Sequence, residues 1–277
     1  MNIKPNVVNL HFIDFCNYKC AYCFVKKENH MLTLEQIMTI VDNVKEYFDK
    51  HKLQGRINLV GGEIFLFNDL QKVIDYIYSK NIKVSMVTNG SLLTEEFIME
   101  NKDKLETIGI SVDSLDENTN IKIGRCCRNK TMKKERLIEL CKCIKNNNIK
   151  LKINTCVSKY NINEDLSDFI ETVNPDRYKI LQMIIVKGVN EKLLPYKTTN
   201  QEFKAYCSKI KHLNPICETD SEISNSYLMI DSKGDFCVDN NTNNKPIGNA
   251  IIENFDELVN KSNFNIENFN KRYSKKG

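Results

Sequence analysis

Short apolar runs alternate with longer amphipathic segments along the first two thirds of the chain. The runs are rich in β-branched residues and predict six strands. These strands are Val7–Ile13, Arg56–Val60, Lys83–Thr88, Thr107–Val112, Lys150–Val157 and Tyr178–Val186. Between them, apolar positions recur at helical spacing and predict helices over Thr33–Lys50, Asn68–Ser79, a segment from Thr94, Met132–Asn146 and Glu164–Val173. Strands separated by helices predict a parallel sheet with helices outside it.

The regular order of these elements predicts an α/β fold, a partial (β/α)6 barrel related to the TIM barrel. In such folds the chemistry lies at the carboxyl ends of the strands. Polar or reactive residues stand at or after the ends of four of the predicted strands. They are Cys16–Cys23, Gly61, Gly62, Glu63, Asn89, Ser111 and Arg125. We therefore expect these residues to gather at one edge of the sheet.

The alternation stops after Val186. The remaining segment predicts a helix over Glu202–His212, a hairpin, a helix near Asn254–Asn260 and a polar tail from Lys271 to Gly277. The hairpin strands, Tyr227–Ile230 and Asp235–Val238, flank Ser232-Lys233-Gly234, a turn sequence. We expect two units, a core over residues 1–186 and a carboxyl-terminal extension over residues 187–277.

Composition narrows the class of protein. The 277 residues are 41% hydrophobic, and 40 basic against 36 acidic residues give a net charge of +4. So small an excess argues against a partner that is a nucleic acid polymer. No run of about 18 apolar residues predicts a membrane span, and the first residues lack a signal-peptide core. We expect a cytoplasmic protein without a membrane partner, whose 11 cysteines stay reduced.

Three cysteines near the start of the chain have the spacing C-x3-C-x2-C. They are Cys16, Cys20 and Cys23. Three thiolates leave one iron of a four-iron cluster open, and an open iron can bind a substrate or cofactor. The alternative is a structural zinc site completed by His11 or His30, although no second C-x2-C pair follows downstream.

The cysteine spacing, with aromatic Tyr22 before the last cysteine, resembles the radical S-adenosylmethionine (SAM) superfamily. In that family the cysteines hold a [4Fe–4S] cluster whose open iron chelates SAM. Gly61-Gly62-Glu63, one strand later, resembles the element that contacts the SAM amino group, with Ile64 where proline is usual. The resemblance also implies SAM contacts at Asn89, Ser111 and Arg125, the last as a partner of the SAM carboxylate.

The likeness narrows to the viperin family and covers nearly the whole chain. It is carried by Asn17-Tyr18-Lys19-Cys20, Cys23-Phe24, Asn89-Gly90-Ser91-Leu92, Asp113-Ser114, Asn120, Ile123-Gly124-Arg125, Lys152-Ile153-Asn154, Asn174-Pro175, Arg177-Tyr178-Lys179, Gln182 and Ser226-Tyr227-Leu228. It implies a soluble nucleotide dehydratase that converts a nucleoside triphosphate to its 3′-deoxy-3′,4′-didehydro analogue, a chain-terminating antiviral nucleotide. The base, whether of CTP, UTP or GTP, stays open.

The same resemblance implies where the nucleotide binds. Lys152, Arg177 and Lys179 are three cations on neighbouring predicted strands and suit a triphosphate, although each alone could be an ordinary strand-end charge. Asn9 and His11 on the first strand are further expected nucleotide contacts, although a lone histidine is more often a core residue.

The expected reaction needs one electron from a donor such as flavodoxin or ferredoxin. SAM then gives methionine and a 5′-deoxyadenosyl radical, which removes the ribose 4′-hydrogen before the 3′-hydroxyl leaves. That hydroxyl needs a proton donor, and Tyr227 and Tyr273 are the candidates, beside water. The polar tail is expected to cover the nucleotide as a lid.

Two other functions remain open on sequence grounds. One is a radical SAM enzyme that modifies a peptide or activates a glycyl-radical protein. Peptide-modifying relatives often carry further cluster cysteines, whereas only Cys207, Cys217 and Cys237 follow Cys156 here. The other is a non-enzymatic iron–sulfur or zinc sensor, for which the remaining motifs would be coincidental.

Overall fold

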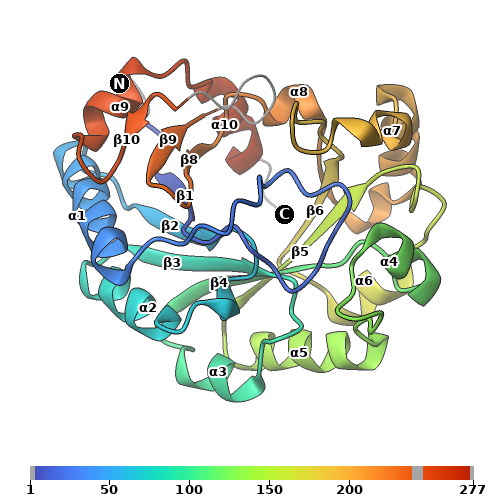
Figure 1. Ribbon diagram of the computed structural model, residues 1–277. Coiled ribbons are helices and arrows are strands. Elements are labelled where there is room, and N and C mark those ends of the chain that lie inside the picture. Colours follow the sequence, from blue (N-terminus) through green and yellow to red (C-terminus); the bar gives the residue numbers. More distant parts are fainter. Residues whose placement is uncertain (1–3, 239–245, 275–277) are drawn as a thin grey trace.

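A curved, ten-stranded sheet surrounds the centre of the molecule in the computed structural model, which describes residues 4–238 and 246–274, with side chains to residue 272 (Figure 1). The strands are β1 (Val7–His11), β2 (Arg56–Val60), β3 (Lys83–Thr88), β4 (Leu105–Ser111), β5 (Lys150–Val157), β6 (Arg177–Gln182), β7 (Ile216–Glu218), β8 (Leu228–Ile230), β9 (Asp235–Cys237) and β10 (Gly248–Asn249). Their order is β10-β9-β8-β1-β2-β3-β4-β5-β6-β7, so the sheet is an open barrel. Among the described strands, β9 pairs antiparallel with both β8 and β10, and the other neighbours in the sheet pair parallel.

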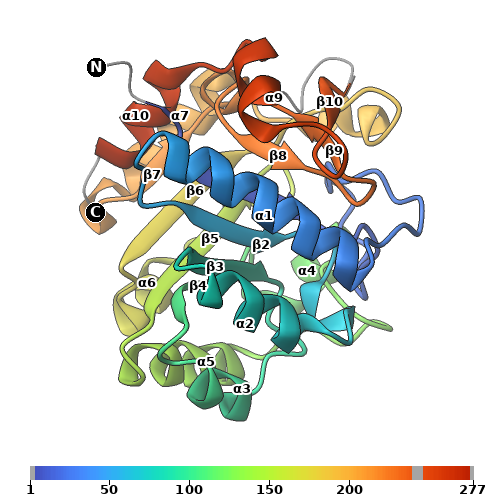
Figure 2. The ribbon, with the colours of Figure 1, turned by 90° about the vertical axis from the view of Figure 1, so that its left-hand side faces the viewer.

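Helices cover the outside of this sheet, as Figure 2 shows for α1 and α2. They are α1 (Leu34–Lys50), α2 (Leu70–Ser79), α3 (Glu95–Glu100), α4 (Glu117–Ile123), α5 (Lys134–Asn146), α6 (Ser167–Val173), α7 (Asn200–Lys209), α8 (Asp220–Ile223), α9 (Phe255–Lys261) and α10 (Ile266–Ser274), with 3-10 turns η1 (Ile64–Leu66), η2 (Glu191–Tyr196) and η3 (Lys211–Leu213). None of the helices described is both long and apolar enough to cross a bilayer. At the start of α1, Thr33 and Gln36 form a reciprocal capping box.

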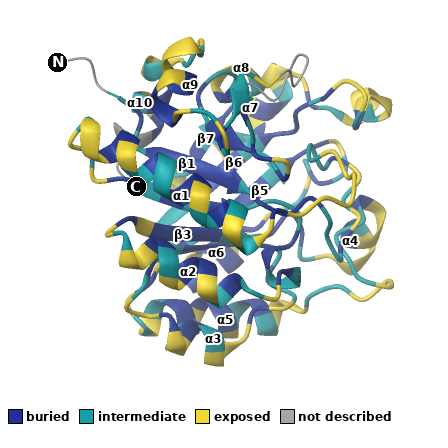
Figure 3. Ribbon diagram, turned by 60° about the vertical axis from the view of Figure 1, so that its left-hand side comes forward, coloured by how far each residue is buried: buried dark blue, intermediate teal, exposed yellow. Residues whose placement is uncertain are grey.

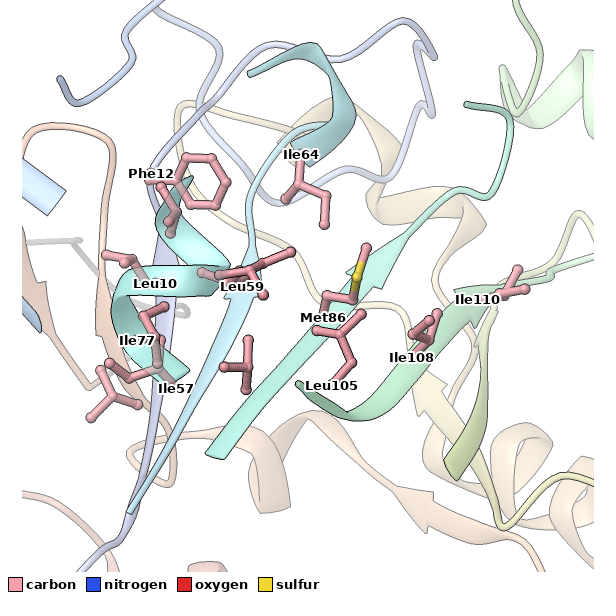
Figure 4. Close-up of a cluster of buried hydrophobic side chains, with 14 of the residues drawn as sticks. Leu10, Phe12, Ile57, Leu59, Ile64, Ile77, Met86, Leu105, Ile108 and Ile110 are labelled. Carbon is pink, nitrogen blue, oxygen red and sulfur yellow. The ribbon is translucent and has the colours of Figure 1, made fainter. Parts of the chain in front are cut away.

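The outward face of the strands is apolar and forms the core. Leu10, Leu59 and Met86 have at most 1% of their surface exposed, and Figure 4 shows them in one apolar cluster that also contains Ile77 of α2. Figure 3 shows the same division, with buried strands inside and exposed residues on the outer faces of the helices. Burial of these side chains contributes about 2 kcal/mol each to folding.

The inward face of the strands is polar. Asn9, Asn58 and Ser85 lie side by side in register on β1, β2 and β3. The Asn58 amide donates to Asn9 Oδ1 over 2.8 Å, and the Ser85 hydroxyl donates to Asn58 Oδ1 over 3.1 Å. Strand side chains alternate between faces, so the same parity that buries Leu10 outside turns polar groups toward the centre. The sheet therefore encloses a polar interior suited to a polar ligand.

The carboxyl-terminal segment supplies strands at both edges of the sheet. β7 pairs parallel with β6, and β8 pairs parallel with β1. The predicted hairpin is confirmed as the antiparallel pair of β8 and β9. The division of the chain at residue 186 stays a prediction, since the sheet itself continues past that point.

Several short elements depart from the sequence prediction. The prediction of a polar tail from Lys271 is wrong as far as Ser274, because these residues belong to α10. Two further departures, α4 and β7, lie close to the candidate site. The segment before Gly124, for which no helix was predicted, contains α4, whose first turn is capped by Asp116 accepting from the Thr119 N–H over 2.7 Å. Strand β7 was not predicted either. Both elements are short, and their hydrophobic patterns span too few residues to show a period.

Candidate active site

The cysteine loop leaves the carboxyl end of β1 and reaches across to α4 (Figure 1). Cys16, Cys20 and Cys23 are half-buried free thiols. The loop is fastened to the end of α4 by two backbone bonds, from the Lys19 N–H to the Gly124 carbonyl (3.0 Å) and from the Ala21 N–H to the Ile123 carbonyl (2.8 Å). A Cβ at Gly124, where φ is +81°, would lie 2.2 Å from the Lys19 carbonyl oxygen. Glycine at this position therefore permits the close contact.

Gly61 and Gly62 bring the end of β2 against the start of the cysteine loop. The Gly62 N–H donates to the Ile13 carbonyl over 2.7 Å, and the Glu63 N–H donates to the Phe15 carbonyl over 3.0 Å. A Cβ at Gly62 would lie 1.9 Å from the Phe15 carbonyl oxygen. The two glycines thus position the cysteine loop through backbone packing.

The Glu63 carboxylate is fully buried and joins β2 to the end of β3. It accepts from the Thr88 hydroxyl (2.7 Å) and from the backbone N–H groups of Asn89 (2.9 Å) and Phe65 (3.3 Å). Burial raises the pKa of Glu63, and these donors oppose that shift. By accepting from the Asn89 N–H, the Glu63 carboxylate fixes the position of Asn89 at the end of β3.

Asn89 in turn contacts the first cysteine. Its amide nitrogen lies 2.8 Å from Asn17 Oδ1 and 3.7 Å from Cys16 Sγ, and the Tyr18 N–H donates to the same sulfur over 3.3 Å. Burial raises the pKa of the Cys16 thiol, which these donors counteract. Hydrogen bonds to a sulfur tune the basicity of a metal ligand.

Arg125 lies beside the second cysteine. Its guanidinium contacts Asp113 Oδ2 (3.0 Å), the Ser111 carbonyl oxygen (2.7 Å) and Cys20 Sγ (3.6 Å). Burial alone would lower the pKa of Arg125, but the Asp113 carboxylate together with Cys20 and Tyr22 outweighs burial, so the net shift is upward. Burial raises the pKa of Cys20 to about 11, against the opposing effect of Arg125. Arg125 and the carbonyl of Ser111 therefore meet at the cysteine loop as expected from their positions.

Asp113 was not among the predicted site residues, yet it organises this region. Its carboxylate accepts from the Tyr22 hydroxyl (2.5 Å) and the Cys156 N–H (2.7 Å) as well as from Arg125. Only 2% of the residue is exposed. Asp113 thus links the cysteine loop, β5 and the Arg125 side chain.

Replacement of Asp113 by asparagine is expected to lower the free energy of unfolding by about 3 kcal/mol, because Arg125 would stay buried without its carboxylate. Urea denaturation of the apoprotein measures the change. Asp116→Asn is the matched control, and asparagine caps a helix about as well as aspartate. Equal effects of the two substitutions would show that Asp113 does not hold Arg125.

Three cations project from β5 and β6. Lys152 lies opposite Arg177 in the register, and Lys179 lies opposite Asn154. Burial, followed by the charges of Lys179 and Arg177, holds the pKa of Lys152 well below its usual range. Within the described residues, Lys152 forms no ion pair and no side-chain hydrogen bond, and the Glu218 carboxylate attracts it only at longer range. The three cations that the sequence predicted to bind a triphosphate therefore lie together in one cluster.

A buried carboxylate, Glu218 of β7, balances part of this charge. Glu218 contacts Lys179 Nζ (2.8 Å) and Arg272 Nε (2.9 Å), and it accepts from the Tyr227 hydroxyl (2.8 Å). Burial would raise the pKa of Glu218, but Lys179 and Arg272 bring it to about 2. Lys179 also donates to the Tyr227 hydroxyl, and the Arg272 guanidinium lies 3.6 Å from the centre of the Tyr227 ring.

The other predicted nucleotide contacts are spread more widely. Asn9 is buried and bonded to Asn58 and to the Leu228 carbonyl. His11 packs edge-on against Phe24 of the cysteine loop at 6.0 Å, and burial lowers its pKa to about 4, so it is neutral at pH 7. The backbone of Tyr273 belongs to α10, but its side chain lies outside the described residues.

Comparison with known proteins identifies the family. The sequence profile of the Radical SAM superfamily matches residues 10–173. The chain belongs to the radical SAM superfamily. Within it, the chain is 33% identical to an S-adenosylmethionine-dependent nucleotide dehydratase of Psychrobacter lutiphocae over 98% of this chain and 96% of that protein. It is 31% identical to a protein of the same name from Selenomonas ruminantium, over 96% and 98% of the two chains. These matches confirm the expected viperin-type family.

A solved radical SAM structure shares the fold. The SuiB protein of Streptococcus suis bound to S-adenosylmethionine superposes with a TM-score of 0.68 at 18% identity, over 92% of this chain. The chain spans about two thirds of the length of that protein (65%). The cofactors of this radical SAM enzyme are accordingly a [4Fe–4S] cluster and SAM.

The residues of the cysteine loop fit these cofactors. All three thiols are free and lie at the carboxyl edge of the sheet, and hydrogen-bond donors reach two of the sulfurs. Among the residues that the structure describes, no three His, Cys, Asp or Glu side chains converge as they would around a single ion. The assignment of Cys16, Cys20 and Cys23 as ligands therefore rests on their spacing, these donors and the family.

Proposed function

We propose that this radical SAM enzyme converts a nucleoside triphosphate to its 3′-deoxy-3′,4′-didehydro analogue. The relatives of 33% and 31% identity are both named nucleotide dehydratases and match nearly the full chain. The observation that carries the proposal is Lys152, a half-buried cation with no ion pair or hydrogen bond in the described structure, inside a group of three positive side chains. A desolvated cation without an ion pair lowers stability, and a polyanionic ligand would compensate for it.

The register of the strands suggests how the nucleotide lies. Ser111, Asn154 and Lys179 form one level across β4, β5 and β6, and Gly109, Lys152 and Arg177 form the level below. Ser111 adjoins Arg125 and the cysteine loop, whereas the lower level lies further toward the amino ends of the strands. A triphosphate on the lower cations would place the ribose on the side of the cysteine loop.

When bound, the reduced cluster and SAM supply a 5′-deoxyadenosyl radical that takes the ribose 4′-hydrogen. The side chains of this chain position the partners of that step. We propose that Gly61, Gly62, Glu63, Asn89, Ser111 and Arg125 shape the SAM site and that Asn9, His11, Lys152, Arg177 and Lys179 shape the nucleotide site. Tyr227 is a proton donor candidate because its hydroxyl group donates to the Glu218 carboxylate and accepts from the Lys179 ammonium group, which can restore a proton that Tyr227 gives up.

Nucleotide affinity is expected to fall as the pH rises through about 8. Burial lowers the pKa of Lys179 to about 8, so its ammonium group loses its proton above that pH. A bound triphosphate raises this pKa, so binding takes up a proton, and affinity weakens by up to about tenfold per pH unit. Calorimetry in buffers of different ionisation enthalpy measures both effects. An affinity that stays constant to about pH 9.5 would exclude Lys179 from the triphosphate site.

The proposed function is tested with reconstituted enzyme, SAM and dithionite. Release of 5′-deoxyadenosine should accelerate when one of CTP, UTP or GTP is added, and the nucleotide product should be lighter by one water. Equal release with and without every triphosphate would contradict the proposal. Stimulation by a peptide instead would favour a peptide-modifying enzyme, and the panel also identifies the preferred base.

A further inference from the structure

A segment next to the cysteine loop carries positive charge without any acidic residue. Residues 118–134 contain six Lys or Arg and no Asp or Glu. One of the six, Arg125, is buried and paired with Asp113. Lys122, Arg128 and Lys130 are exposed, and the described structure shows no ion pair for any of them. The chain as a whole is nearly balanced, so this local excess is distinct from the net charge.

The backbone holds these charges beside the expected cluster. Lys122 lies in the last turn of α4, and the two residues after it include Gly124, which bonds to the cysteine loop. Arg128 lies in a tight turn, Cys127 to Lys130, closed by reciprocal backbone bonds of 3.0 and 2.9 Å. Arg128 and Asn129 have φ of 49° and 60°. A bulky residue rarely adopts this left-handed conformation. The turn therefore holds an arginine at a position where glycine or asparagine would have less backbone strain.

Exposed apolar groups accompany the charges. Ile121 of α4 is 37% exposed and Leu92 is 39% exposed. Leu92 follows Ser91, whose hydroxyl accepts from the Asn17 amide of the cysteine loop over 2.9 Å. The neighbouring loop is close, since a Cβ at Gly90 would lie 3.3 Å from Met132 Sδ. Apolar groups beside unpaired charges are typical of a transient protein interface.

We propose that Lys122, Arg128 and Lys130, together with Ile121 and Leu92, form the docking surface for an acidic one-electron carrier protein. This surface is called the α4 patch below. It rests on the radical SAM chemistry of the proposed function, which requires a reductant, and does not depend on which nucleotide is the substrate. In the step served, the reduced carrier loses one electron and the cluster gains it, and no bond of this chain forms or breaks. The α4 patch is joined by backbone bonds to the cysteine loop, so a carrier bound there would lie near the expected cluster.

The α4 patch is tested by the triple substitution Lys122→Glu, Arg128→Glu and Lys130→Glu. The probe is a bacterial flavodoxin, whose binding to the holoenzyme is measured by calorimetry. The dissociation constant is expected to rise by at least about tenfold, because opposed charges become like charges. The matched control is Lys102→Glu, Lys209→Glu and Lys211→Glu. These three lysines are exposed and precede β4 and β7, so they lie at the amino ends of the strands, away from the cysteine loop at the carboxyl ends. It changes the net charge equally and should leave binding within about twofold.

Two measurements on the unmodified protein also test the α4 patch. Binding of flavodoxin should weaken steadily between about 0.05 and 0.5 M salt. Carbodiimide, which joins lysine amines to carboxylates, should link flavodoxin to Lys122 and Lys130, as peptide mapping would show. Cross-links confined to other lysines, or binding insensitive to salt, would overturn the proposal.

Further measurements distinguish an acidic carrier protein from RNA as the partner of the α4 patch. They also distinguish a failure of this proposal from a failure of the proposed function. Dithionite needs no docking surface, so nucleotide-dependent release of 5′-deoxyadenosine with dithionite should be the same in the triple variant and the control. If the variant loses affinity for RNA while flavodoxin binding is unchanged, the α4 patch is a polyanion surface and the proposal is wrong. If the unmodified enzyme binds flavodoxin through the α4 patch but no nucleotide stimulates it, only the nucleotide assignment fails.

Discussion

Protein carrying Cys16→Ala is expected to lose the [4Fe–4S] absorption after reconstitution and to cleave no SAM above background. Two thiolates cannot replace the three that leave one iron open for SAM. The donors that reach Cys16, from Tyr18 and Asn89, would then have no sulfur to contact. Iron content, visible absorption and 5′-deoxyadenosine release measure the loss, which should be at least about a thousandfold in rate.

Cys143→Ala is the matched control for this substitution. Cys143 is a half-buried free thiol on α5, away from the cysteine loop. It should bind iron and cleave SAM as the unmodified protein does. Full activity of Cys16→Ala with zinc in place of iron would show that the cysteine loop holds a structural metal.

Lys152→Met is expected to change stability and nucleotide binding in opposite directions. Methionine removes a half-buried charge that forms no ion pair among the described residues and that Lys179 and Arg177 repel. The free energy of unfolding should therefore rise by about 1–2 kcal/mol. Loss of a charge-assisted phosphate contact should weaken nucleoside triphosphate binding by about 2 kcal/mol or more, which is about 30-fold.

Lys150→Met distinguishes this effect from a general effect of removing charge from β5. Lys150 is exposed on the same strand, 3.8 Å from Glu106. Its replacement should change stability and nucleotide affinity by less than about 0.5 kcal/mol. If Lys152→Met destabilises the protein and leaves nucleotide binding intact, Lys152 is an ordinary structural residue.

The sequence was sufficient for the parts of the site that depend on local order. The strand ends at Gly62, Asn89 and Ser111 follow from hydrophobic patterns, and parallel strands bring their carboxyl ends to one edge. The alternation of Lys152 and Asn154 along β5 likewise predicts a common face. The structure adds that Gly62 works through close backbone packing against Phe15, which no residue pattern states.

The residues that the sequence did not reveal depend on long-range pairing. Glu218 meets Arg272, 54 positions later, and Lys179 of β6, and it lies on a three-residue strand without a visible period. Asp113 was visible only as part of a family motif, because a carboxylate after a strand resembles a helix cap or turn. Its partners Tyr22 and Cys156 are 91 and 43 positions away. Such contacts need the topology before they can be inferred.

Transfer of deuterium from C4′ of the nucleotide tests the central claim most directly. The preferred triphosphate, deuterated at C4′, is incubated with reconstituted enzyme, SAM and dithionite, and the 5′-deoxyadenosine is analysed by mass spectrometry. The account predicts 5′-deoxyadenosine one mass unit heavier, formed together with the didehydro nucleotide. Unlabelled 5′-deoxyadenosine from a nucleotide recovered unchanged would contradict it.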